Sequence, residues 1–99
     1  MTVPVRILRK AQADLLEIHS YIGRERPSAA RRVVDVLLHA IDTLSENPEK
    51  GPLARDERLR RRGFRFLSSS RYLIFYKARQ GGVRVYRVLH GKRDYRRLL

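Results

Sequence analysis

Residues 72–90 read YLIFYKARQGGVRVYRVLH, and this stretch determines the fold that we expect. Its first part, residues 72–78, is apolar on both of its alternating faces, which is typical of a central strand covered on both sides. The run Gln80-Gly81-Gly82 then supplies the positive-φ positions of a tight turn. Residues 83–90 form the returning strand. The stretch therefore predicts an antiparallel β-hairpin inside a sheet.

The returning strand alternates regularly between two faces. Because Arg87 falls on an apolar face, we expect its guanidinium to lie at the edge of a packed surface, where it needs a partner. That partner is either a carboxylate, from Asp94 or from a helix, or a bound ligand. The two faces carry Val83, Val85, Arg87 and Leu89 on one side, and Arg84, Tyr86, Val88 and His90 on the other.

Two amphipathic helices precede this hairpin. Residues 10–24 and 27–46 each carry apolar side chains every three or four positions, which follows one face of a helix. Pro27 and Ser28 suit the first turn of the second helix, and Asn47-Pro48 ends it. Because the connection between the helices is short, we expect an antiparallel helical hairpin. The first stripe consists of Ala11, Leu15, Ile18 and Ile22.

The remaining segments complete the sheet. Residues 2–8 are β-branched and alternate, which predicts a first strand, with Pro4 at an edge or where pairing begins. Residues 63–67 predict a strand that a turn at residues 68–71 joins to the central hairpin. Residues 49–62 have no period and predict an irregular connection.

The order of these elements, β-α-α-β-β-β, indicates an α+β fold. We expect a helical hairpin packed on one face of a mostly antiparallel four-stranded sheet. Residues 92–99 follow the last strand as a short basic tail, with room for one helical turn. At this length we expect a single domain over residues 1–99.

Charge is distributed unevenly along the chain. Its 99 residues include 23 Lys and Arg against 10 Asp and Glu, which gives a net charge of +13. Residues 51–99 contain fifteen basic and three acidic side chains, or +12, whereas residues 10–50 contain six basic and seven acidic ones. We therefore expect a basic face and a near-neutral face, with a polyanion or an acidic protein as partner.

Several function classes have no support in the sequence. Without cysteine there is no disulfide, thiolate nucleophile or cysteine-based zinc site. No HExxH, P-loop or dinucleotide glycine motif is present, so we expect neither a metal nor a cofactor. No apolar run could span a bilayer and no secretory signal is visible, so we expect a cytoplasmic protein that has no membrane partner.

Guanidinium groups are the chemistry that the sequence does offer. One cluster lies between Arg55 and Arg65 and a second between Arg84 and Arg97, and tyrosines lie among them. The planar guanidinium suits phosphate or carboxylate, and tyrosine can stack on a base. For any single arginine of Arg58–Arg62, a solvated loop is the simpler interpretation.

Motifs along nearly the whole chain occur in a familiar order. The longest motif comes last and reads Val85-Tyr86-Arg87-Val88-Leu89-His90-Gly91-Lys92-Arg93-Asp94. The first helix carries Ala13-Asp14-Leu15 with Ile18, Tyr21 and Ile22, and the second begins with Pro27, Ala29 and Ala30 and ends with Ile41, Leu44, Asn47-Pro48 and Gly51. The central strand carries Tyr72, Ile74 and Tyr76. In this order and spacing the chain resembles the ParE/RelE toxin superfamily, most closely the ParE-like, or plasmid-stabilisation, toxins. The fold of that family is the one that the periodicity indicates.

The resemblance implies a type II toxin–antitoxin module. Its partner would be an acidic, partly disordered ParD-like antitoxin that folds onto the toxin, which suits the basic half of this chain. We expect a hetero-oligomer in which the antitoxin covers the helical hairpin and the adjoining sheet edge. The residues expected to contact it are Leu15, Ile18, Ile22, Val34, Leu37, Leu38 and Ile41.

Two targets are open within the superfamily. ParE-like members poison DNA gyrase and are not known as nucleases, and that reading makes the chain a binding protein without catalytic residues. The residues that would face the target are Arg87, His90, Arg93, Arg96 and Arg97.

The alternative is a RelE-like, metal-independent endoribonuclease that cleaves mRNA on the ribosome. Arg93 matches a catalytic arginine of those enzymes, but a second arginine falls at Ser68 and a late tyrosine at Leu99. An enzyme would therefore use Arg65, Arg71, Arg93 and Tyr95. A third hypothesis is a nucleic-acid-binding domain without toxicity, because charge alone gives affinity for phosphate.

Overall fold

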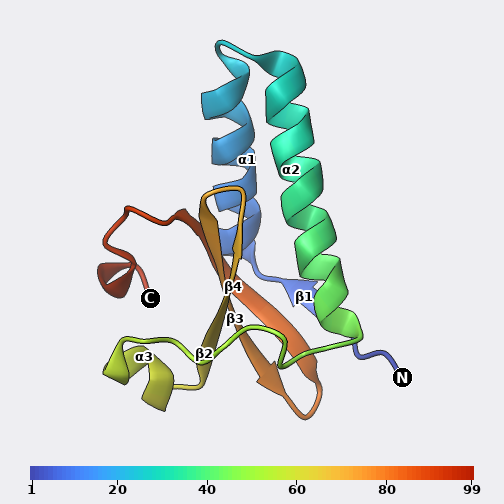
Figure 1. The fold of residues 1–99 in the computed structure, drawn as a ribbon, viewed down its shortest axis with the longest axis vertical. Coiled ribbons are helices and arrows are strands. Elements are labelled where there is room, and N and C mark those ends of the chain that lie inside the picture. The colour runs from blue at the N-terminus through green and yellow to red at the C-terminus, as the bar shows by residue number, and fades with distance from the viewer.

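The predicted helical hairpin is present in the computed structural model, which describes residues 1–99 (Figure 1). Helix α1 spans Arg9–Gly23 and antiparallel α2 spans Pro27–Asp42, and the 3-10 helix η1 at Thr43–Ser45 extends α2. The apolar stripes of both long helices face the sheet, as their periodicity predicted. None of the helices combines the length and the apolar character that a membrane span requires.

The sheet contains four strands in the order β1-β4-β3-β2. The strands span Val5–Ile7 (β1), Phe64–Ser69 (β2), Tyr72–Arg79 (β3) and Gly82–His90 (β4). Only β1 runs parallel to its neighbour, so the sheet is mostly antiparallel, as predicted. The first strand is shorter than the predicted residues 2–8. Pairing begins at Pro4, whose carbonyl accepts the N–H of Val83 at 2.9 Å.

Two apolar clusters lie on opposite faces of the sheet, which confirms that β3 is covered on both sides. The cluster under the helices includes Leu37, Tyr76 and Val85, all fully buried. The other cluster is centred on Phe64 and Phe75. Figure 1 shows helix α3 and the C-terminal segment on the side of the sheet away from α1 and α2.

Helix α3 corrects the prediction that residues 49–62 are irregular. It spans Glu57–Arg61 and begins at Asp56, whose Oδ1 accepts the backbone N–H of Leu59 at 3.0 Å. Leu59 is completely buried in the second cluster, so one apolar anchor holds the helix on β2. A helix of five residues has too few turns to show a period. The basic tail does contain one helical turn, η2 at Tyr95–Arg97.

A β-bulge in β4 corrects the predicted alternation. Val85 pairs with Tyr76, but the next pair joins Arg87 to Phe75, so Tyr86 is an extra residue. Beyond this point the faces exchange. Val83, Val85 and Val88 therefore belong to the helix-side cluster, whereas Leu89 belongs to the other one. Arg87 does not share a face with Val83 and Val85.

The residues with a positive φ in the two hairpin turns differ from those that were predicted. Between β3 and β4 only Gly82 is positive, at 130°, and a Cβ there would lie 2.5 Å from the carbonyl oxygen of Pro4. Between β2 and β3 the two turn residues are Ser70 and Arg71, with φ of 51° and 70°. Because neither is glycine, this turn is strained.

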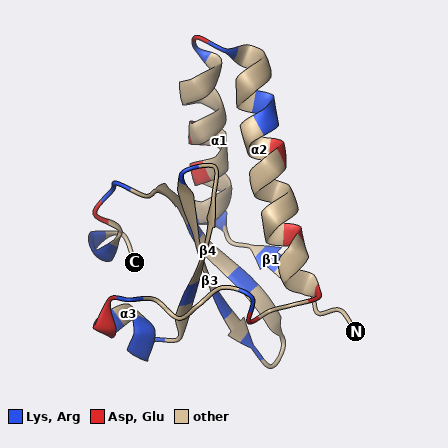
Figure 2. Cartoon of the chain, in the orientation of Figure 1, with Lys and Arg blue, Asp and Glu red and all other residues tan.

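The charge asymmetry of the sequence reappears in the fold. Figure 2 shows both signs of charge on the helical hairpin, whereas the strands carry blue bands only. None of the four strands contains Asp or Glu. The basic excess is therefore concentrated on the sheet, α3 and the C-terminal segment.

Candidate target- and partner-binding surfaces

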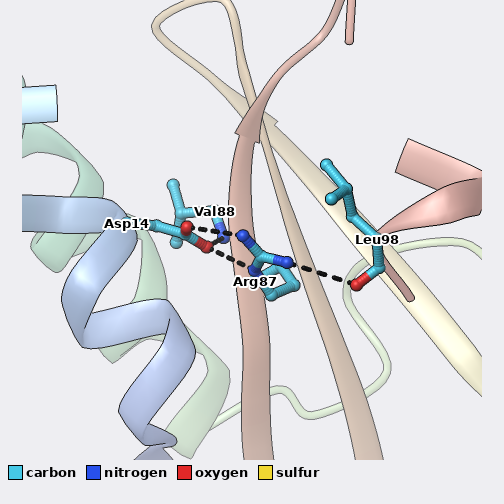
Figure 3. Close-up of polar contacts among 4 residues, drawn as sticks. All are labelled: Asp14, Arg87, Val88 and Leu98. Atoms are coloured by element: carbon cyan, nitrogen blue, oxygen red, sulfur yellow. Dashed lines mark hydrogen bonds and ion pairs between the residues drawn. The ribbon is translucent and has the colours of Figure 1, made fainter. Parts of the chain in front are cut away.

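A buried ion pair joins the first helix to the last strand (Figure 3). Nε of Arg87 donates to Oδ2 of Asp14 at 2.8 Å and its second terminal nitrogen donates to Oδ1 at 2.8 Å. The remaining terminal nitrogen of Arg87 donates to the carbonyl oxygen of Leu98 at 3.2 Å. The side chains of Arg87 and Asp14 are only 15% and 10% exposed. This bidentate geometry is the strongest that the two groups can adopt.

The length of β1 explains why a carboxylate is needed at this place. Strand β1 pairs with β4 only as far as Val85, so the edge of β4 beyond that residue has no neighbouring strand. The backbone N–H of Val88 on this edge donates to Oδ2 of Asp14 at 2.9 Å. Asp14 thus takes the place of a strand partner and also neutralises Arg87. Its hydrogen bond raises the pKa of Arg87, although burial acts in the opposite direction.

Of the two partners expected for Arg87, the structure contains the helix carboxylate. Its guanidinium uses three of its five N–H groups, two on Asp14 and one on the carbonyl oxygen of Leu98. This pairing supports the structural role for Arg87 rather than the expected target contact. The residue instead fixes β4, α1 and the C-terminal segment to one another.

Two other residues of the expected target surface lie together. His90 and Arg93 line a groove of about 480 Å³ between α1 and the end of β4. Nδ1 of His90 accepts the backbone N–H of Lys92 at 3.1 Å, and its ring meets that of Tyr72 edge to face at 5.5 Å. Burial, followed by Tyr21, raises the pKa of Tyr72. The other lining residues are Asp14, Glu17, Ile18, Ser20, Tyr21, Arg24, Tyr72, Val88 and Leu89.

Arg96 and Arg97 lie outside this groove. Both are exposed on η2, and Nε of Arg96 lies 3.6 Å from Oδ1 of Asp94. Arg97 lines a shallow depression with Arg93, Asp94 and Leu98. Arg93 takes part in both hollows, so it connects the groove to the exposed arginines of the tail.

The two arginine clusters of the sequence meet at the C-terminal segment, which the sequence did not indicate. Arg58 donates to the carbonyl oxygen of Arg96 at 2.6 Å, and Arg62 donates to that of Leu99 at 2.8 Å. The ring of Tyr95 lies 4.9 Å from that of Phe75. Arg58 and Arg62 are therefore more than solvated loop residues, because they hold a basic segment by its carbonyl groups.

Two residues of the nuclease alternative, Arg65 and Tyr95, lie on opposite faces of the sheet. Arg65 pairs across the strands with Tyr76, donates to the carbonyl of Gly51 at 2.8 Å and lies 3.5 Å from Glu49. Tyr95 packs on Phe75, on the opposite face of the sheet. Arg71 is at the tip of the β2–β3 hairpin and Arg93 lines the groove. The sheet itself separates Arg65 from Tyr95.

Most of the residues that were expected to contact an antitoxin are buried, so that prediction needs a correction. Leu15, Ile18, Leu37 and Ile41 are 8%, 7%, 0% and 2% exposed, because the apolar stripes of the helices pack on the sheet. Ile22 and Val34 are half-buried, and of the seven only Leu38 is exposed. The large apolar side chains that the hairpin does expose are Leu16, Tyr21, Val36 and Leu38.

Comparisons with known proteins agree with the fold and the motifs. A family model described as the ParE toxin of type II toxin–antitoxin system, parDE, matches residues 5–95. Toxin RelE2 of Caulobacter vibrioides is 38% identical over 84 residues, which cover 85% of this chain and 90% of that protein. A solved structure titled "Chromosomal ParDE TA system from P. aeruginosa" superimposes with a TM-score of 0.77. It covers 90% of this chain and 96% of that one at 17% identity, which shows the same fold. The chain therefore belongs to the ParE toxin family of type II toxin–antitoxin systems.

Proposed function

We propose that this toxin inhibits DNA gyrase and that His90 and Arg93 contact the target. The observation that carries the proposal is the groove where these two side chains meet, with Arg96 and Arg97 exposed next to it. A cationic guanidinium beside a histidine can bind an acidic or phosphate-bearing surface. No covalent step is needed, because a toxin that holds gyrase in one state acts by binding alone.

The arrangement of the alternative catalytic residues favours gyrase over mRNA. A nuclease needs its proton acceptor and its phosphate-binding cations around one reacting group. Arg65 and Tyr95 lie on opposite faces of the sheet, and Arg65 is engaged with Gly51 and Glu49. These residues could not reach one phosphodiester together in this conformation.

A gyrase assay separates the two targets. Purified toxin, added to gyrase and relaxed plasmid, should block supercoiling or accumulate cleaved complexes. Arg93→Ala should require at least roughly tenfold more protein, because it removes a charge-assisted contact. Arg31→Ala, which removes the same charge from the exposed face of α2, is the matched control. Cleaved mRNA in a translation extract, with gyrase unaffected, would contradict the proposal.

We also infer that a ParD-like antitoxin covers the helical hairpin. Leu16 and Tyr21 on α1 are 71% and 70% exposed, although both are large apolar residues. Exposed apolar groups of this size on a highly charged protein indicate a partner surface. The basic excess lies on the sheet rather than on the hairpin, so acidic residues of the antitoxin would bind the adjoining sheet edge.

The antitoxin surface can be tested by co-purification with a ParD-like protein chosen from the small acidic proteins encoded beside the toxin gene. Leu16→Glu should weaken the complex by on the order of tenfold or more, because it places a charge in an apolar contact. Leu53→Glu is the control, since Leu53 is also exposed, at 45%, but lies outside the hairpin. Equal affinity of both variants would place the antitoxin on another surface.

A further inference from the structure

A row of basic side chains crosses the sheet on the face away from the helical hairpin. Arg6 of β1 is in register with Arg84 of β4, and Arg84 is in register with Lys77 of β3. Their sequence neighbours Val5, Val83 and Tyr76 belong to the helix-side cluster, so the three cations share the other face. Strands are about 4.8 Å apart, so neighbouring cations are close.

Two arginines extend this row at β2. Lys77 is in register with Phe64, and its Nζ lies 4.6 Å from the centre of the Phe64 ring. The guanidinium of Arg62 lies 5.0 Å from the same ring, and that of Arg79 donates to the carbonyl oxygen of Arg62 at 3.1 Å. Burial, followed by Arg79 and Arg62, lowers the pKa of Lys77, as expected where cations gather. We call Arg6, Arg84, Lys77, Arg62 and Arg79 the cationic row.

No Asp or Glu side chain neutralises the cationic row, although Arg62 also donates to an oxygen of Leu99 at 2.8 Å. None of its five members takes part in an ion pair. The nearby acidic residues of α3 and the tail have other partners: Asp56 caps α3, Glu57 pairs with Arg61, and Asp94 pairs with Arg96. Like charges directly opposite one another on a sheet are destabilising. A row of this kind costs the free chain stability and is relieved when an anion binds.

We propose that the cationic row binds the phosphodiester backbone of a nucleic acid. A phosphate backbone presents regularly spaced charges and needs no apolar anchor. An acidic peptide that folds on binding does need such anchors, and the exposed ones lie mainly on the helical hairpin. The row is also distinct from the His90–Arg93 groove, because it lies at the opposite ends of β3 and β4. DNA and RNA both present this phosphate backbone, so the experiment below determines which of the two the row binds.

The test measures binding of the purified full chain to fluorescein-labelled 20-nucleotide probes at several salt concentrations. Duplex DNA, single-stranded DNA and single-stranded RNA are compared, together with labelled poly-L-glutamate. The triple variant Arg6→Gln/Lys77→Gln/Arg84→Gln should lower the slope of log affinity against log salt by about 2 to 3, since each phosphate contact contributes about 0.7 to 0.9. Its thermal stability should change little, because the repulsion that is relieved offsets the lost contact of Lys77 with the Phe64 ring.

The matched control is Arg26→Gln/Arg31→Gln/Arg32→Gln, which removes three exposed charges from the helical hairpin. A selective loss of slope in the sheet variant, on any of the three nucleic acids, supports the proposal and identifies the source. An equal loss in both triple variants overturns it, as does a selective loss on poly-L-glutamate alone. Because gyrase is absent from the assay, this outcome is independent of the proposed target.

Discussion

Asp14→Ala should lower the free energy of unfolding by about 3 to 5 kcal/mol, one of the largest losses that a single substitution in this chain can cause. It leaves the guanidinium of Arg87 buried without a counter-charge and the N–H of Val88 without an acceptor. An unpaired buried charge costs more than the net stabilisation that the pair provided. Urea denaturation of the purified protein measures the loss. Asp35→Ala, at an exposed carboxylate of α2, should change the free energy by less than about 0.5 kcal/mol.

A double-mutant cycle distinguishes a lost ion pair from lost packing. Asp14→Leu/Arg87→Met removes both charges, so it should be more stable than either single variant. Its free energy of unfolding should still be about 1 to 3 kcal/mol lower than that of the wild type, because the N–H of Val88 has no acceptor. If the losses in unfolding free energy of the two single variants simply add in the double variant, Asp14 and Arg87 are not coupled.

The long elements of this fold could be predicted because each repeats one local pattern. The apolar stripe of α1 recurs every three or four residues along the helix, and β3 begins with an uninterrupted apolar run. Helix α3 was not predicted, because its five residues follow a cap and contain one apolar anchor, Leu59, but show no helical period. The bulge at Tyr86 was not predicted, because the register of a strand depends on its partner strand as well as on its own sequence.

The surfaces were harder to predict than the fold. Asp14 and Arg87 are 73 positions apart, so their pairing depends on how α1 crosses β4. The apolar stripe of α1 was assigned to the antitoxin, but the same residues are needed for the core. The exposed residues Leu16 and Tyr21 lie off that stripe, which is why we propose them in its place as contacts for the antitoxin. The cationic row requires strand register, which no local pattern contains.

Gly51→Ala should also be strongly destabilising, by about 3 kcal/mol or more. Gly51 is buried where the connection after η1 meets β2 and β3. A Cβ at this position would lie 2.2 Å from the carbonyl oxygen of Phe66 and 3.0 Å from the hydroxyl of Tyr76. The first contact is with backbone, so rotation of a side chain cannot relieve it.

The surrounding hydrogen bonds leave no simple way for the chain to move aside. The backbone N–H of Gly51 donates to the Tyr76 hydroxyl at 2.9 Å, and its carbonyl accepts from Arg65 at 2.8 Å. Phe66 donates its own N–H to the carbonyl of Pro52 at 3.1 Å. Any displacement large enough to accept a methyl group must therefore break at least one buried hydrogen bond. Gly81→Ala is the matched control, because a Cβ there meets nothing within 4 Å and its φ is not positive. Urea denaturation should show a loss at Gly51 and little change at Gly81, and similar small changes at both would mean that the loop at Gly51 relaxes freely.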